Sequence, residues 1–177
     1  MSVQPKIVSI EPKKLHYCVN GEWVTSKTDT YMNCYNPSTG EVIAQAPQCT
    51  AEEVEATIAA AKAAYPAWSN TPVVKRVQVM YKMKALLEKH LDELTEILAT
   101  EMGKAWEEAK GDVLKVLEVV EFACGMPQLM KGEALMDCST GYDTTMYHHS
   151  VGVFAGIAPW NFPAMIPQGW MAPICIA

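Results

Sequence analysis

The chain has 177 residues, of which 50% are apolar and 19% charged, which suffices for one domain with a hydrophobic core. Its net charge of -6 argues against nucleic acid and anionic membrane surfaces as partners. The first residues lack a basic region followed by an apolar core, so no secretory signal is predicted. The six cysteines form no Cys-x-x-Cys pair, and reduced thiols in a cytoplasmic protein are therefore expected.

The N-terminal section predicts an irregular arm followed by short strands. Residues 1–14 are polar and show no regular pattern. Residues 15–24 alternate and contain Asn20-Gly21, a dipeptide typical of a two-residue hairpin turn. Strands are then predicted over residues 31–35 and 41–46, on either side of a turn rich in Asn, Pro and Gly at residues 36–40.

Helical spacing begins at Thr50. Together with Glu53 this residue forms a capping box, in which each side chain accepts a hydrogen bond from the other residue's backbone N–H. Pro66 is predicted to end the first helix. Thr71-Pro72 is predicted to open the next helix, with the proline at its first position.

The remaining helical section is predicted to contain two boundaries and one further long helix. We expect a break near His90 and a stop at Gly103. A third helix is predicted over residues 105–130. The predicted apolar faces of the three helical segments comprise Val54, Ile58, Ala61 and Tyr65, then Val77, Met80, Tyr81, Lys84, Leu87 and Leu91, then Val113, Val116, Leu117, Val120 and Cys124.

The C-terminal stretch from Thr144 to Ala177 contains no Asp, Glu, Lys or Arg. It predicts strands over residues 143–149 and 151–158, a tight turn at 159–163 and a buried helix. Asn161 is the one amide in this junction, and a buried amide either is bonded within the protein or meets a ligand. Prolines and Gly169 interrupt the stretch, which argues against a membrane-spanning helix. Its apolar end predicts that further sequence follows or that another chain covers it.

Few local motifs for chemistry are present. His148-His149 is predicted to lie in a strand, where the two side chains point to opposite faces, so no metal site is expected. The cysteines are interpreted as core residues, because none has a local signature of a reactive thiol. The sequence contains no Gly-x-Gly-x-x-Gly fingerprint for a dinucleotide.

Five ordered blocks give the chain a resemblance to the aldehyde dehydrogenase superfamily, which extends from Val19 to Ala177. The blocks are Asn20–Trp23, Asn36–Ile43, Ala64–Trp68, Glu101–Lys104 and Pro159–Pro163. Two stretches, Gly111–Cys124 and Ala155–Pro167, are similar to the coenzyme-A-acylating methylmalonate-semialdehyde dehydrogenase branch.

The resemblance implies an α/β fold, namely the N-terminal portion of an aldehyde dehydrogenase-like fold. A Rossmann-type cofactor domain would be begun but incomplete, with strands of an oligomerisation arm. The implied parts are an irregular arm at 1–14, strands and helices of the cofactor-binding domain at 15–141, an arm strand at 142–150, and the first strand, turn and helix of the cofactor-binding sheet at 151–177. Such enzymes oxidise an aldehyde through a cysteine thiohemiacetal, reduce NAD or NADP, and release the acyl group to water or coenzyme A.

The resemblance also assigns roles to residues of this sequence. Asn161 matches the oxyanion-hole amide, and Ile157, Ala158, Pro159 and Trp160 match the strand end that borders the dinucleotide. Phe162, Met165 and Ile166 match the wall of the aldehyde tunnel. None of the six cysteines matches the nucleophile, and the general-base glutamate lies beyond the matched region. Trp160 stands where the methylmalonate branch has Phe.

Lys115 receives two different interpretations. Its position relative to Val113 and Leu117 places it outside the buried stripe, which predicts a solvated lysine. By resemblance, however, it stands where the methylmalonate branch has an arginine for the substrate carboxylate. A lysine keeps the charge but loses the bidentate fork, so we expect a relaxed preference between malonate-type semialdehydes and simple aldehydes such as propanal.

Together these features predict the N-terminal part of a cytoplasmic, NAD-dependent, coenzyme-A-acylating aldehyde dehydrogenase, inactive by itself. The expected substrate is a small aldehyde or semialdehyde, and the expected assembly is a homodimer or homotetramer. One alternative is a hydrolytic aldehyde dehydrogenase that gives a free acid. The other is a truncated, non-catalytic assembly module.

Overall fold

The computed structural model describes residues 12–177, so most of the arm predicted at residues 1–14 lies outside the described residues. The chain divides into two compact units. The first contains residues up to Ala60 together with Thr100–Gly103, and the second contains Ala61–Ala99 together with Lys104–Ala177.

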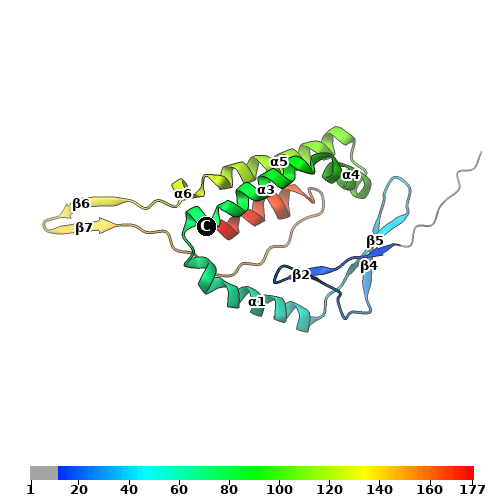
Figure 1. The fold of residues 1–177 in the computed structure, drawn as a ribbon, viewed down its shortest axis with the longest axis horizontal. Helices are drawn as coiled ribbons and strands as arrows, with labels where there is room; N and C mark the ends of the chain where they lie inside the picture. Colours follow the sequence, from blue (N-terminus) through cyan, green and yellow to red (C-terminus); the bar gives the residue numbers. More distant parts are fainter. Residues whose placement is uncertain (1–11) are drawn as a thin grey trace, which may run out of the picture. The chain divides into compact units, whose positions relative to one another are not determined.

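The first unit carries a three-stranded sheet and a hairpin (Figure 1). The sheet has the order β1 (Lys13–Lys14), β5 (Val42–Pro47) and β4 (Tyr31–Tyr35), with β1 parallel and β4 antiparallel to β5. The hairpin pairs β2 (Tyr17–Val19) with β3 (Glu22–Val24). Asn20 and Gly21 between them have φ angles of 52° and 77°, as the predicted tight turn requires. The hairpin and the strands predicted at 31–35 and 41–46 are confirmed.

One short strand was not expected from the sequence. Lys13 and Lys14 pair with Ala44 and Gln45 of β5, so the end of the predicted irregular arm is a strand. Two successive lysines carry no apolar alternation, but backbone pairing at a sheet edge needs none, and lysine is a typical edge residue.

The capping box at the start of α1 (Ala51–Ser69) is confirmed and reaches further than predicted. Thr50 N donates to Glu53 Oε2 at 2.9 Å, and Glu53 N donates to Thr50 Oγ1 at 3.3 Å. The buried Glu53 carboxylate also accepts bonds from the Ser26 hydroxyl and from Lys27 N, both at 2.7 Å. These hydrogen bonds hold the pKa of Glu53 below its ordinary value, and the bond from Ser26 has the largest effect. The carboxylate thus anchors the loop at residues 26–28 to the helix start.

Two predicted helix boundaries near residues 66–72 are wrong. Pro66 lies inside α1, where its fixed φ angle fits the helix although it removes one backbone hydrogen-bond donor. The last turn is closed by Asn70, whose side-chain amide donates to the Pro66 carbonyl at 2.7 Å. Pro72 is the residue before α2 (Val73–Arg76), where it serves as N-cap and not as first helical residue.

The breaks predicted at His90 and Gly103 are confirmed. His90 separates α3 (Gln78–Lys89) from α4 (Leu91–Met102). Gly103 follows α4 with a φ of 66°, the left-handed conformation that ends many helices. A Cβ on Gly103 would lie only 2.8 Å from Pro37 Cγ.

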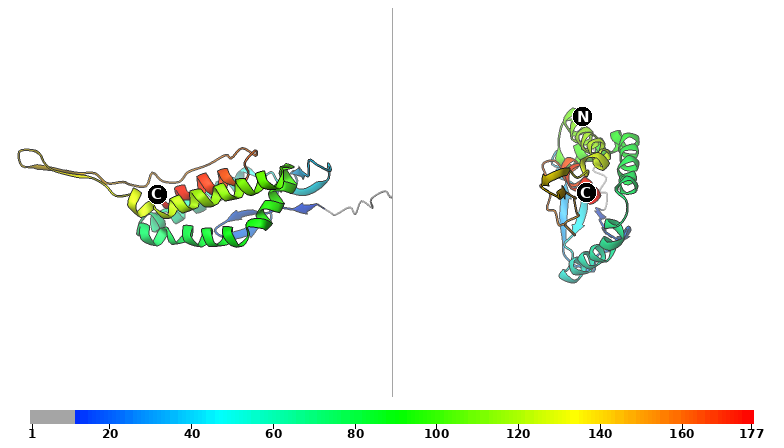
Figure 2. Two further views of the ribbon diagram at one scale, coloured as in Figure 1. Left: turned by 90° about the horizontal axis from the view of Figure 1, so that it is seen from above. Right: turned by 90° about the vertical axis from the view of Figure 1, so that its left-hand side faces the viewer.

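The core of the second unit is built around α5 (Trp106–Cys124). Figures 1 and 2 show α3 on one side of α5 and the two C-terminal helices on another. These are a π-helix, η1 (Met165–Met171), and a 3-10 helix, η2 (Ala172–Ile176). The buried cluster comprises Val77, Met80, Leu87, Val116, Val120, Ala123 and Ile176. The apolar faces predicted for α3 and α5 are therefore largely confirmed, although the third helix ends at Cys124 because Gly125 separates it from α6 (Met126–Leu129).

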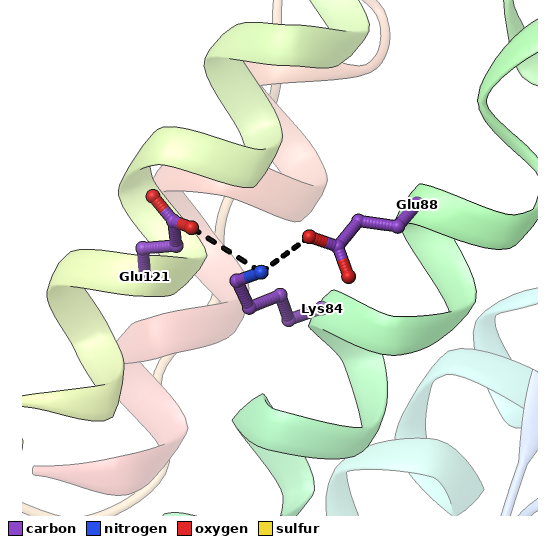
Figure 3. A network of polar contacts seen from close by, with 3 residues as sticks. All are labelled: Lys84, Glu88 and Glu121. Atoms are coloured by element: carbon purple, nitrogen blue, oxygen red, sulfur yellow. Dashed lines mark hydrogen bonds and ion pairs between the residues drawn. The ribbon is translucent and has the colours of Figure 1, made fainter.

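The predicted stripe of α3 includes one charged residue, Lys84. Figure 3 shows its side chain reaching from α3 to α5, where the ammonium lies 3.3 Å from the Glu121 carboxylate and also pairs with Glu88. These two carboxylates raise the pKa of Lys84, and Glu88 has the larger effect. The charge is accommodated on the stripe because it bridges the two helices.

The segment between α6 and η1 differs most from expectation. Instead of a single arm strand at 142–150, β6 (Ala134–Ser139) and β7 (Tyr142–Thr145) form an exposed antiparallel hairpin that projects from the helices of this unit (Figure 1). Residues 151–158 form no strand. A strand needs a neighbour for its backbone groups, and within residues 12–177 no strand lies beside this segment. The turn near 160–164 and a following helix are present as predicted.

Among the described helices, none combines the length and apolar character needed to cross a bilayer.

Candidate active site

A cavity of about 510 Å³ lies in the second unit, where the beginning of α5 meets the turn before η1. One wall consists of residues on or just before α5, and the other of residues in the turn and at the start of η1. In chain order the lining residues are Lys104, Glu108, Gly111, Asp112 and Lys115, then Asn161, Phe162 and Met165.

Helical spacing explains the α5 wall. Glu108, Asp112 and Lys115 are separated by four and three residues, so they share one face. Each directly precedes a buried residue of the core stripe, and one residue corresponds to about 100° around a helix. The cavity therefore lies beside the hydrophobic core and not within it.

Asp112 is the central polar group of this site. Its side chain is only 1% exposed. Oδ1 accepts a hydrogen bond from Met165 N at 2.9 Å, and Oδ2 lies 3.4 Å from the Lys104 ammonium. The Lys104 ammonium also lies 4.2 Å from the centre of the Phe162 ring, a cation–π contact. Through these contacts a residue of α5 holds the turn that carries Asn161.

The structure brings together four of the residues assigned by resemblance: Asn161, Phe162, Met165 and Lys115. As its position outside the buried stripe predicts, Lys115 is exposed, and it pairs with Glu118 three residues later. It lies on the cavity wall all the same. Its ammonium is therefore solvated and also close to the candidate substrate space.

The remaining assigned residues do not line the cavity. Ile157 and Trp160 are 97% and 82% exposed, and Pro159 is exposed as well. Ala158 and Ile166 are half-buried outside the lining. Asn161 is exposed, so the expectation of a buried junction is wrong for the described residues, and within residues 157–161 only Ala158 is half-buried.

Sequence reasoning missed Lys104 and Asp112 as site residues. Both stand in quoted blocks, Lys104 after Gly103 and Asp112 beside Gly111. The available signal was an aspartate directly before Val113 on a helix whose other face is apolar. An acid so close to a core stripe is either solvated or paired, and spacing does not identify its partners across 53 residues of chain.

A second, more polar cavity of about 570 Å³ is also found in the second unit, with Tyr65, Arg76, His148 and His149 among its lining residues. Both histidines follow β7, so their placement on opposite faces of a strand is wrong. Arg76 already donates to the backbone carbonyls of Ser69, Thr71 and Ile176 at 2.7–3.2 Å. Within residues 12–177 no group of three or more His, Cys, Asp or Glu side chains could hold a metal ion.

All six cysteines fall within the described residues, and none lines either cavity. Burial raises the pKa of the Cys124 thiol, which disfavours the thiolate needed for nucleophilic attack. Residues 12–177 therefore place no cysteine thiol in the cavity beside Asn161.

The sequence profile of the aldehyde dehydrogenase family matches residues 23–177. A malonate-semialdehyde dehydrogenase of Bacillus cereus is 44% identical over 96% of this chain and 35% of its own length. The acylating mitochondrial methylmalonate-semialdehyde dehydrogenase of Arabidopsis thaliana is 42% identical over 99% of this chain and 28% of its own length. Among solved structures, a methylmalonate-semialdehyde dehydrogenase of Sinorhizobium meliloti 1021 complexed with NAD has a TM-score of 0.88 and 36% identity, covering 94% of this chain and 34% of that one. The chain thus spans about a third of the length of these relatives.

Proposed function

We propose that this chain, which belongs to the aldehyde dehydrogenase family, supplies the oxyanion donor and part of the substrate and cofactor walls of an NAD-dependent semialdehyde dehydrogenase that transfers the acyl group to coenzyme A. The complete enzyme would have to provide the nucleophilic cysteine and the general base. For that reason residues 1–177 by themselves are expected to be inactive.

The observation that carries the proposal is the composition of the cavity. It contains an amide donor, Asn161, a cation, Lys115, and the apolar side chains of Phe162 and Met165. A malonate-type semialdehyde needs an amide N–H for its carbonyl oxygen and a cation for its carboxylate. The Asn161 amide would donate to the oxygen that becomes negative when a thiol attacks, and such donors are typically worth about 3 kcal/mol.

The segment proposed to border the dinucleotide fits an aromatic cofactor. Ile157 and Trp160 present exposed, uncharged side chains, which offer apolar surface to a planar ring. Residues 144–177 contain no Lys or Arg, so the phosphates of the cofactor would be held by groups elsewhere in the protein. The cofactor, NAD or NADP, would accept the hydride of the aldehyde.

The relatives support the finer parts of the proposal. The Sinorhizobium meliloti protein is complexed with NAD, and the Arabidopsis thaliana protein is described as acylating. The exposed hairpin β6–β7 carries Leu135, Met136 and Tyr142, which are 61%, 76% and 70% exposed. Such a surface supports assembly of the complete protein into a homodimer or homotetramer.

The complete protein tests the proposal directly. Purified enzyme with malonate semialdehyde, NAD and coenzyme A should produce NADH, followed by its absorbance, and an acyl-coenzyme A thioester detectable by mass spectrometry. NADH formation at a rate independent of coenzyme A, with a free acid as the product, would support the hydrolytic alternative. Absence of NADH or NADPH formation with both the semialdehyde and propanal would support the assembly module and overturn the proposal.

A further inference from the structure

We propose that Asp112 and Lys104 form a positioning unit that fixes the turn carrying Asn161, so that its amide is held ready for the substrate oxygen. This inference rests on the proposed role of Asn161 and extends it to two residues without an assigned role. Neither residue needs to touch the reacting atoms, because both act through the conformation of the turn.

The contacts pin the turn at two points close to Asn161. The Asp112 carboxylate accepts the Met165 backbone N–H at 2.9 Å, four residues after the amide. The Lys104 ammonium lies 4.2 Å from the ring centre of Phe162, the residue directly after it. A separation of 3.4 Å between Lys104 Nζ and Asp112 Oδ2 joins the two points into one unit.

Burial makes this unit a strong constraint. The Asp112 side chain is 1% exposed and that of Lys104 is 18% exposed, so water competes little for their interaction. A buried carboxylate without its cation is strongly unfavourable, and so is a buried N–H without its acceptor. A movement of the turn away from α5 would break both the hydrogen bond from Met165 N to Asp112 and the contact between Lys104 and Phe162. An oxyanion donor depends on such preorganisation, and a misplacement of about 1 Å can reduce turnover by ~100-fold.

Four variants of the complete protein test the unit. Asp112→Asn keeps the shape and an acceptor oxygen but removes the charge that holds Lys104, and Lys104→Met removes the cation. Each should lower kcat by about 10-fold while the KM for the semialdehyde and the affinity for NAD change less than about twofold. Lys104→Arg keeps the charge and should recover most of the loss. Glu107→Gln is the matched control, because it removes a negative charge from the same helix at an exposed residue that does not line the cavity, and it should leave kcat within about twofold.

A double-mutant cycle separates positioning from general stability. If Asp112 acts through the amide, Asp112→Asn should cost nothing further in an Asn161→Ala background. An undiminished loss of about 10-fold in that background would overturn the inference, since the carboxylate would then act independently of Asn161.

Amide hydrogen exchange tests the same link without any activity. The Met165 N–H should exchange at least about 10-fold faster in Asp112→Ala than in the wild-type protein, while amides in the α3–α5 core keep their rates. If Asp112→Ala fails to fold, Lys104→Met provides the test, because the Lys104 side chain is only half-buried and its replacement should destabilise the fold less. Unchanged Met165 exchange in a folded variant would overturn the positioning unit. A wild-type protein without dehydrogenase activity but with a protected Met165 amide would instead overturn only the proposed function.

Discussion

The two units of this chain each contain a buried carboxylate that ties a distant segment to a helix, and they balance its charge differently. Glu53 in the first unit is surrounded by neutral donors, the Ser26 hydroxyl and the N–H groups of Lys27 and Thr50. Asp112 in the second unit has one backbone N–H and the ammonium of Lys104. Neutral donors suffice where the carboxylate only closes a loop. A countercharge adds a second attachment where the held segment borders a cavity.

Only the second unit is proposed to have a role in catalysis. The variant Asn161→Ala tests this role and has the largest expected effect. In the complete enzyme this change should lower kcat by ~100-fold or more, because it removes the proposed transition-state donor. The affinity for NAD, measured by fluorescence titration, should stay nearly unchanged. A decrease of less than a few-fold would assign the amide a structural role.

Glu53→Ala should have the larger effect on stability. It leaves three donors without their acceptor, so the melting temperature should fall by several degrees, while kcat of the remaining folded enzyme stays unchanged. Glu52→Ala is the control, since that neighbouring carboxylate is exposed. Equal melting temperatures for the two variants would show that the loop anchor contributes nothing.

The pH dependence of folding stability tests the contribution of the Glu53 carboxylate further. Because the pKa of Glu53 is lower in the folded protein than its ordinary value of 4.5, its stabilisation is complete above that value and is lost as the pH falls through the folded pKa. Glu53→Gln should therefore lose less stability than the wild type on acidification below about pH 4.5, measured by urea unfolding. Parallel stability curves for the two proteins would contradict the lowered pKa.

Lys115→Met should have the smallest effect. Because Glu118 competes for its exposed ammonium, Lys115 should hold a substrate carboxylate only weakly. The ratio of kcat/KM for malonate semialdehyde to that for propanal should fall by about threefold. Lys110→Met, which changes a charge on the same helix away from the cavity, is the control. A strong preference that collapses in Lys115→Met would show instead that the lysine is the main carboxylate anchor.

Local signals explain which parts of the fold were predictable. The Asn20-Gly21 turn, the Thr50–Glu53 cap and the break at His90 depend on residues a few positions apart, and all three are present. Residues 151–158 were expected to form a strand because of their apolar composition. Strand formation, however, requires a neighbouring chain segment, which composition does not reveal.

The candidate site was predictable only where a motif contained it. Asn161 stands in a specific motif, and the cavity indeed includes it. The Asp112 contacts join residues 53 positions apart, and no spacing rule connects them. The Lys104 contact to Phe162 likewise depends on how α5 packs against η1. Sequence patterns therefore identified the residue proposed to act, and tertiary packing identified the residues that hold it.

Gly103 illustrates how unevenly this chain should tolerate substitution. Gly21 also has a left-handed backbone, but nothing lies within 4 Å of where its Cβ would be, and asparagine adopts such a conformation at little cost. At Gly103 the first side-chain carbon would already meet Pro37 at 2.8 Å, before any question of backbone preference arises. In a library of all single-residue variants selected for soluble protein, Gly21→Asn should persist and Gly103→Asn should be depleted. Two glycines with the same backbone geometry would then differ in how freely they can change during evolution.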